Sequence, residues 1–322
     1  MRYLVRRLGF LLVALWAAMT VNFFIPRLMP GNPAESILGQ FHGHINPSAL
    51  KALEAAFGIG KHQNILISYF EYLRNSLTGN FGASFSQGGT PVATVIAHDL
   101  PWTLGLVGLS TILGFVFGTA LGAIAAWRRG GRLDNVLPPS FIIISAFPYF
   151  WVGLLCIWFF SFTLNWLPYE GGFNQTSSPA FGDIMIHAIL PAFTIVITSI
   201  GGWILTMRNN MITVVAEDYV KMARAKGLKN QRILWQYAGR NALLPNLTGF
   251  AMSLGFVISG AILVEDVFNY PGVGFLLLQA VNAEDYPLMQ ALFLLITVAV
   301  LIAIFCADVA TAILDPRTRG GN

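Results

Sequence analysis

Charge is scarce in this sequence. Asp, Glu, Lys and Arg make up 11% of its 322 residues, whereas 55% of the residues are hydrophobic and the mean hydropathy is +0.64. A soluble protein needs about 25% charged residues to cover its surface. The shortage therefore excludes a soluble globular enzyme and indicates a chain that lies in a lipid bilayer.

Residues for metal, nucleotide or disulfide chemistry are also few. The two cysteines, Cys156 and Cys306, lie in apolar runs, so they form neither a disulfide framework nor a metal-binding pattern. The sequence contains no Gly-x4-Gly-Lys-Ser/Thr, the pattern that cradles nucleotide phosphates. His42 and His44 have no third ligand nearby and are interpreted as part of a solvated loop. We expect no catalytic residue, no cofactor site and no metal site in this chain.

Long windows without charge are what the sequence does contain. A helix that spans a bilayer needs about 20 apolar residues, and seven charge-free windows are candidates: 8–26, 75–98, 100–127, 135–169, 184–207, 241–264 and 286–307. The window 75–98 is rich in Gly, Ser and Asn, which cannot satisfy its backbone in hydrocarbon, so we reject it as a span. The sequence thus predicts an all-α membrane protein with six transmembrane helices.

The basic residues predict the orientation of these helices. Fifteen of the nineteen Lys and Arg residues fall on one side of the six-helix arrangement. Because basic residues mark the cytoplasmic side, we expect both termini and the loop 208–245 in the cytoplasm and residues 27–99 outside. In so apolar a chain, the net charge of +4 is better explained by this orientation than by nucleic-acid binding.

Two outer loops contain no basic residue, and this suggests a negatively charged mouth. They carry six acidic residues: Glu170, Asp183, Glu265, Asp266, Glu284 and Asp285. We expect such a mouth to repel anions and to favour a neutral, zwitterionic or cationic solute.

The outer segment after the first helix carries helix signals. Asn46 can cap a helix that Gly58 ends, and Leu66, Phe70 and Leu77 fall on one face of a second helix. We expect an extracytoplasmic helical platform over 28–99, between a first transmembrane helix at 1–27 and a core domain at 100–322. Two interfacial helices that merely cover helix ends explain the spacing equally well.

The inner loop 208–245 also reads as helical. Glu217 lies four residues before Lys221, which supports a helix, and Gly227 can end it. Ala223 and Ala225 leave two nearly bare positions, which would let another backbone or side-chain cluster approach closely, as suits docking. A purely topogenic role for these basic residues remains the alternative.

Within the predicted spans, the glycine, proline and isolated polar residues can be explained by structural roles. Gly114, Gly118 and Gly122 form a stripe that permits tight helix packing, and Pro148 and Pro191 are expected to kink or start their helices. The isolated polar residues could line a path or hydrogen-bond between helices; they are Asn22, Ser145, Thr198, Ser199 and Ser253.

The inner loop carries a resemblance to a known family. Glu217–Leu228 followed by Arg240–Pro245 resembles the EAA-type cytoplasmic loop of ABC importer permeases, and most of all that of the dipeptide and oligopeptide permease family. Other segments resemble the family in the same order along the chain: 29–33, 79–82, 100–104, 187–191, 260–268 with 270–274, and Asp308 with 315–319. Asn32 and Asn80 stand where the family usually has Asp.

This resemblance implies a fold, partners and sites. The fold is the type I ABC importer fold with an extracytoplasmic helical insertion after the first helix, in the cytoplasmic (inner) membrane. The partners are a second permease subunit, which is usually a different chain, two ATPase subunits that hold ATP and magnesium, and an extracytoplasmic solute-binding protein. The residues implied for ATPase coupling are Glu217, Asp218, Tyr219, Ala223, Arg224, Ala225 and Gly227. Those implied for the outer gate and binding-protein contact are Glu265, Phe268, Pro271, Gly272 and Gly274.

The cargo implied by the resemblance is a di- or oligopeptide. Relatives in this family also carry nickel complexes or cello- and xylo-type oligosaccharides, and aromatic residues in the turn 167–173 would suit sugar rings. Two other classes compete. An ion-coupled secondary transporter would need ionisable groups within the membrane. The only candidates are His187, near the end of a charge-free window, and Asp308, just after the last one. An intramembrane serine hydrolase would have to use Ser84, which lies in the rejected polar window.

Overall fold

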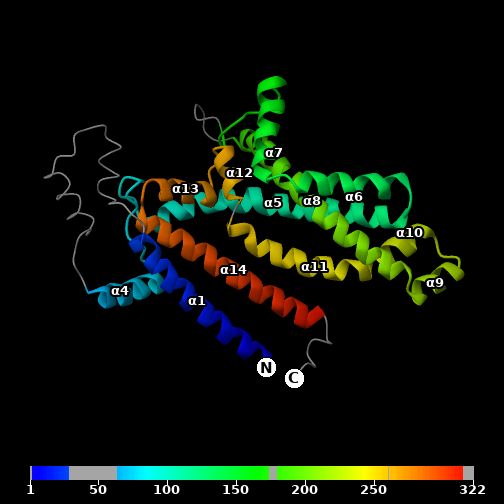
Figure 1. The fold of residues 1–322 in the computed structure, drawn as a ribbon, viewed down its shortest axis with the longest axis horizontal. Helices are drawn as coiled ribbons and strands as arrows, with labels where there is room; N and C mark the ends of the chain where they lie inside the picture. The colour runs from blue at the N-terminus through cyan, green and yellow to red at the C-terminus, as the bar shows by residue number, and fades with distance from the viewer. Residues whose placement is uncertain (1, 29–63, 174–179, 260, 315–322) are drawn as a thin grey trace.

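The computed structural model describes residues 2–28, 64–173, 180–259 and 261–314 (Figure 1). These residues form helices, turns and an isolated β-bridge between Ala83 and Pro91. The helices are α1 (Arg2–Leu28), α4 (Ile65–Thr78), α5 (Val92–Trp127), α6 (Arg132–Ser145), α7 (Tyr149–Cys156), η1 (Ile157–Thr163), α8 (Phe181–Val215), α9 (Asp218–Ala225), α10 (Asn230–Arg232), η2 (Ile233–Gly239), α11 (Arg240–Gly255), η3 (Phe256–Ser259), α12 (Ile262–Val267), α13 (Val273–Asn282) and α14 (Tyr286–Leu314). The predicted helix signals at Asn46 and Gly58 lie outside the described residues.

The six predicted spans are all present, one of them in a bent form. Five helices are long and apolar enough to cross a membrane: Arg6–Leu28, Val92–Trp127, Phe181–Val215, Asn230–Ser259 and Tyr286–Cys306. The sixth is the pair Arg132–Ser145 and Tyr149–Thr163, whose axes differ by 98°. The prediction of an all-α protein with six transmembrane helices is confirmed.

The boundaries of the second span differ from the prediction. The helix α5 begins at Val92, eight residues before the window that starts at residue 100. The charge-free window was cut at Asp99, but an acidic residue at the outer end of a long helix lies outside the hydrocarbon and does not interrupt the helix. The rejected window does contain the turn between α4 and α5, so its rejection as a span is correct.

The prolines act differently from one another. Pro148 is the residue before α7 and marks the bend after α6, because proline keeps the preceding residue, Phe147, out of helical geometry. The predicted window 135–169 is therefore not one straight helix. Pro191 lies inside α8, ten residues after its first residue, so of its two expected roles, kinking or starting a helix, only the start is excluded.

The pair α5 and α8 forms the most extensive helix contact of the described residues. The predicted glycine stripe makes this contact possible. A Cβ on Gly118 would lie 2.5 Å from the Cβ of Trp203, and one on Gly122 would lie 2.4 Å from the carbonyl oxygen of Ile204. The stripe is thus confirmed as packing architecture, because any side chain here would push the two helices apart.

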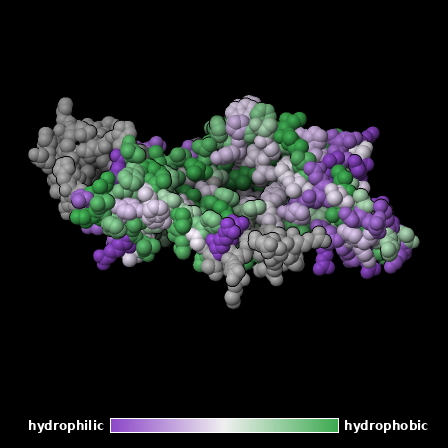
Figure 2. All heavy atoms as spheres, turned by 60° about the horizontal axis from the view of Figure 1, so that its bottom comes forward, coloured by the Kyte–Doolittle hydropathy of each residue, from purple (hydrophilic) through white to green (hydrophobic). Residues whose placement is uncertain are grey.

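The remaining helices are arranged around this pair. In Figure 1, α6 runs beside α8, while α11, α14 and α1 follow one another in adjacent layers, in agreement with their contacts. The helices α4 and α13 lie at one end of the molecule and α9 and α10 at the other. Figure 2 shows hydrophilic residues gathered at the end that carries α9 and α10, whereas hydrophobic residues line much of the middle. A long apolar body with polar ends fits a protein that crosses a bilayer.

Adding one methyl group at Gly122 is expected to destabilise the protein. Because the new Cβ would meet the backbone of α8, Gly122→Ala should lower the free energy of unfolding by about 1–3 kcal/mol. The matched control is Gly105→Ala on the same helix, where nothing lies within 4 Å of the new Cβ. Thermal unfolding in detergent measures both variants, and equal midpoints would contradict the glycine contact.

Candidate functional site

The inner loop folds into the short helix α9 between two turns. The helix α8 ends at Val215, Glu217 is the residue before α9, and Gly227 follows α9 with φ +73°, which favours glycine. The predicted helix and its glycine stop are therefore present. The predicted partner of Lys221 is not: its ammonium binds Asp218 at 2.9 Å, three residues away, rather than Glu217. This hydrogen bond holds the pKa of Asp218 below its usual value.

One face of α9 is buried against its own chain. Val220 and Ala223 pack into a cluster, called here the inner cluster, whose buried residues come from five helical segments. They are Ala123, Ala126, Met207, Met211, Val220, Ala223, Ile233, Leu234, Ala238 and Ala242. Ala223 is only 3% exposed. The expectation that Ala223 is an open docking position is therefore wrong, since its small size serves the packing of α9 onto α5, α8 and η2.

The opposite face of α9 is exposed at the end of the molecule (Figure 1). The other six residues predicted for coupling are all exposed there: Glu217, Asp218, Tyr219, Arg224, Ala225 and Gly227. Met222, which is 59% exposed, was missed. Its spacing of three residues from Tyr219 and from Ala225 could have placed it on the same helix face.

Two contacts hold this exposed face in register with the membrane helices. The hydroxyl of Tyr219 accepts a hydrogen bond from the Asn241 amide at 2.7 Å. The guanidinium of Arg224 lies 5.2 Å from the centre of the Trp127 ring, a cation–π distance. Since Trp127 ends α5 and Asn241 lies in the first turn of α11, a force on α9 is passed directly to two spans.

At the end of the molecule that carries α13, which the sequence predicts to face outward, a buried carboxylate joins three segments. Glu265 is fully buried and accepts hydrogen bonds from the Thr103 hydroxyl at 2.9 Å and from the amides of Gly274 at 2.8 Å and Phe275 at 3.2 Å. The Thr103 oxygen in turn accepts a hydrogen bond from the amide of Val273 at 2.7 Å. We call these five residues the outer clamp, because they tie α12 and α13 to α5.

Burial dominates the protonation chemistry of this clamp. It raises the pKa of Glu265, against the opposing effect of the hydrogen bonds that the carboxylate accepts. The neighbouring Tyr270 has its pKa raised to about 12, first by burial and then by the charge of Glu265.

The outer residues predicted to touch a binding protein are mostly internal. Glu265, Phe268, Gly272 and Gly274 are buried, and only Pro271 is partly exposed. A Cβ on Gly272 would lie 2.5 Å from Glu265 Oε2, so glycine is needed for the clamp to close. The prediction that these residues form a contact surface is therefore wrong for four of the five: Glu265 and Gly274 belong to the clamp, and Phe268 and Gly272 are buried as well. Their expected role in a gate stays a prediction.

A second buried carboxylate fixes the turn before α5. Asp285 accepts hydrogen bonds from the hydroxyls of Ser84 and Ser86 and from the amides of Ser86 and Leu288. This bonding accounts for Ser84 as a structural residue of the turn. The predicted acidic mouth also changes, because Glu265 and Asp285 are both buried and only Glu170 and Asp266 of the six acids are fully exposed.

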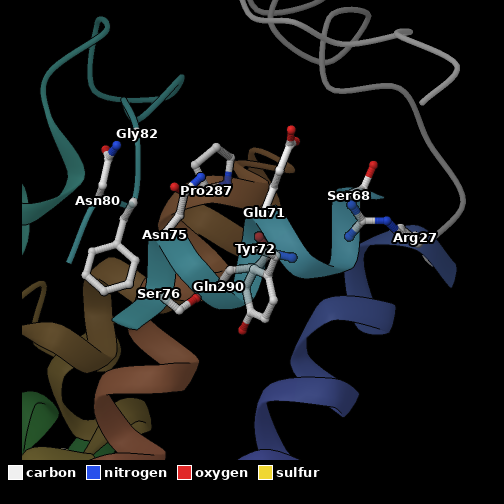
Figure 3. A pocket seen from close by; sticks show the side chains of 11 residues that line it. Arg27, Ser68, Glu71, Tyr72, Asn75, Ser76, Asn80, Gly82, Pro287 and Gln290 are labelled. Carbon is white, nitrogen blue, oxygen red and sulfur yellow. The ribbon is translucent and has the colours of Figure 1, made fainter. Parts of the chain in front are cut away.

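Two cavities open near this outer end. The first, of about 530 Å³, lies between α1, α4 and α14 and is mostly polar, with Arg27, Tyr72, Asn75 and Gln290 in its lining (Figure 3). The helix α4 is held beside α1 by the Asn22 amide, which donates to Tyr72 at 3.0 Å.

The second cavity, of about 580 Å³, lies beside the outer clamp. It includes His98, Asp99, Phe173 and Pro271. Pro271 is thus the one predicted outer residue that reaches an open recess.

Of the five polar residues singled out in the sequence, four have their hydrogen bonds within their own helix and one joins neighbouring helices. The hydroxyls of Ser145, Thr198, Ser199 and Ser253 each donate to a carbonyl of their own helix. Asn22 is the exception, because it binds Tyr72 and the carbonyl of Gln290. His187 bonds the Asp183 carbonyl oxygen at 2.9 Å, as expected for a satisfied residue near a helix end.

Comparison with known proteins gives a consistent result. The family model described as binding-protein-dependent transport system inner membrane component matches residues 118–320. The chain is 33% identical to the dipeptide transport system permease protein of Lactococcus lactis subsp. cremoris, with 99% of each chain covered. It is 32% identical to the oligopeptide transport system permease protein of Bacillus subtilis, with 98% of each covered. It is also 32% identical to the glutathione transport system permease protein of Escherichia coli, with 99% of each covered.

Removing the carboxylate of the outer clamp is expected to cost stability. Glu265→Ala leaves two buried amides and a hydroxyl without their acceptor, so the free energy of unfolding should fall by at least about 1–3 kcal/mol, the cost of one such donor. Asp266→Ala, next to it but exposed, is the control and should be neutral. Thermal unfolding in detergent measures the difference. A stable Glu265→Ala variant would show that the clamp contributes little.

Proposed function

Since the chain belongs to the family of binding-protein-dependent transport system inner membrane components, we propose that it is the permease subunit of an ABC importer that brings peptides into the cell. The observation that carries the proposal is its similarity, over nearly the full chain, to permeases named for dipeptide and oligopeptide transport. Two of the six acids of the predicted outer mouth are buried and four are exposed or half-buried, so its effect on the choice of cargo stays a prediction.

A multi-pass permease of this family works with ATPase and binding-protein partners. We infer a finer arrangement for this chain: a second permease subunit beside it, two ATPases that carry ATP and magnesium at the inner end, and a solute-binding protein at the outer end. Both termini would then lie in the cytoplasm. The exposed, polar face of α9 supports the placement of the ATPases, since it stands at the end of the molecule opposite α4 and α13 (Figure 1).

The packing of α9 suggests how ATP hydrolysis would move the membrane helices. An ATPase that grips the exposed face would displace α9 as a rigid piece. Val220 and Ala223 would carry this displacement into α5, α8 and η2, because close-packed side chains transmit strain rather than absorb it. The contacts of Tyr219 with Asn241 and of Arg224 with Trp127 add polar links on the same route.

The cargo is tested with the full complex in proteoliposomes. Uptake by the permease pair, its ATPases and its own binding protein should be inhibited by unlabelled tri- to pentapeptides. Cello- and xylo-oligosaccharides or nickel complexes should not compete. Competition by one of these in place of peptides would reject the peptide cargo and leave the importer assignment unchanged.

The ATPase contact is tested by enlarging Ala225. Because this residue is exposed on α9, Ala225→Trp should leave the permease folded while it obstructs the approach of an ATPase. Transport and ligand-stimulated ATP hydrolysis should then fall together by about tenfold, equivalent to 1.4 kcal/mol of lost coupling.

Ala225→Ser, which keeps the residue small, is the matched control and should behave as the unmodified protein. Co-purification of the ATPases reports whether the complex still assembles. Full transport by an assembled Ala225→Trp complex would contradict a role for this face in coupling.

A further inference from the structure

A third cavity, of about 540 Å³, lies where two helical segments break. One wall is the bend between α6 and α7, which contributes Ser145, Phe147 and Tyr149. The floor is α8, with Thr198 and Ser199. Ala261, the residue before α12, closes a further side, and Figure 1 shows α7 and α12 next to one another above α8.

The cavity lies deep in the membrane. Thr198 is seventeen residues from Phe181 and seventeen from Val215, the two ends of α8. At about 1.5 Å per residue, each end is about 25 Å away. The hydrocarbon core is about 30 Å thick, so a site in the middle of this helix lies within it.

The backbone around the cavity has polar groups that no helix satisfies. The amides of Trp151 and Val152 bond the carbonyl of Pro148, and no side chain caps α7. The amides of Tyr149 and Phe150 come before the first helical hydrogen bond and have no acceptor within α7. At the other break, the amides of Val264 and Glu265 both return to Ala261, and no side chain caps α12.

Such a backbone is tolerated at this depth only where it is buried in protein or lines a water-filled space. Residues 145–149 are not buried in this chain. Their backbone then needs either cover from a partner chain or contact with water, and the cavity beside them offers room for water.

The side chains of the cavity lining offer neutral hydrogen-bonding groups. Ser145, Thr198 and Ser199 donate their hydroxyl protons to their own helices at 2.8, 2.8 and 3.2 Å. The hydroxyl oxygens retain lone pairs that can accept. None of the three hydroxyls has its hydrogen bond to another helix, although Ser145 packs against Gly201 of α8 and Ser199 against Gly114 of α5. The lining contains no charged residue.

We propose that this cavity is a mid-membrane station on the path of the cargo, where amides of the α6–α7 bend and hydroxyls of α8 contact the backbone of a peptide. An uncharged set of donors and acceptors can hydrogen-bond the backbone amide groups that all peptides share. Binding by this set does not depend on the side chains of the peptide. Phe147 and Tyr149 supply apolar contact at the rim. The proposal rests on the peptide importer function above and assigns residues to its path.

Water access in the assembled complex tests the proposal. Cys156 and Cys306 are first replaced by Ala, and Thr198→Cys is then exposed to a small hydrophilic methanethiosulfonate. The matched control is Thr111→Cys, which lies near the middle of α5, is also half-buried and also bonds its own helix at 2.7 Å, but does not line the cavity. Because only the cavity holds water, Thr198→Cys should react at least about tenfold faster than Thr111→Cys.

Peptide added with the binding protein and ATP should slow the labelling of Thr198→Cys. Thr198→Trp should reduce uptake at least about tenfold, equivalent to 1.4 kcal/mol, while Thr111→Trp should have a smaller effect. Equal labelling of the two cysteines would overturn the proposal, even if peptide uptake is intact. Rapid labelling without protection by peptide would overturn the peptide station, and the competition assay then shows whether the cargo assignment has failed as well. Ser145→Cys repeats the test from the other wall if Thr198→Cys does not assemble.

Discussion

The close approach of α5 and α8 is the constraint on which the rest of the structure depends. Gly118 and Gly122 bring the backbones of the two helices together without an intervening side chain. In a bilayer, where lipid is as apolar as any helix surface, such packing is a main source of helix association. Among the residues that the structure describes, each of the three buried clusters takes residues from α5, and two of them also take residues from α8. The pair therefore serves as the axis to which the functional ends are attached.

The two ends are attached to this axis by different chemistry. At the inner end, small and apolar residues hold α9 in a tight contact, which the Tyr219–Asn241 hydrogen bond and the Arg224–Trp127 cation–π contact supplement. At the outer end, the buried carboxylates of Glu265 and Asp285 collect amides and hydroxyls from distant segments. A buried carboxylate holds its hydrogen-bond donors in fixed positions, because burying the charge without these hydrogen bonds costs roughly several kcal/mol of free energy. The inner end can thus move as a packed piece, whereas the outer end is held in one geometry.

The sequence was sufficient for the number of spans and for the helical loop, because both follow from local composition and helix signals. It was insufficient wherever a residue's role depends on burial. Glu265 and Asp285 count as external charges in the sequence, yet their donors, such as Thr103 and Ser84, lie far away along the chain. Ala223 and Ala225 look equivalent at two-residue spacing, but only the first faces the protein. The bend at Pro148 was signalled by the proline, while its 98° angle reflects tertiary packing.

The outer clamp and the mid-membrane cavity are joined through one aromatic residue. Phe268 lies in the turn after α12, and its ring is 3.2 Å from the place where Gly153 of α7 would carry a Cβ. Phe268 also belongs to a buried cluster with Leu190 of α8 and Cys156 of α7. The clamp holds α12, so α12 and Phe268 in turn limit where α7 can stand relative to α6. A change at the outer surface that loosened the clamp would therefore alter the α6–α7 bend, whose backbone lines the cavity. The helices α5 and α8 also contribute residues to the inner cluster, so these two helices connect both ends, and the cavity lies along α8 between them.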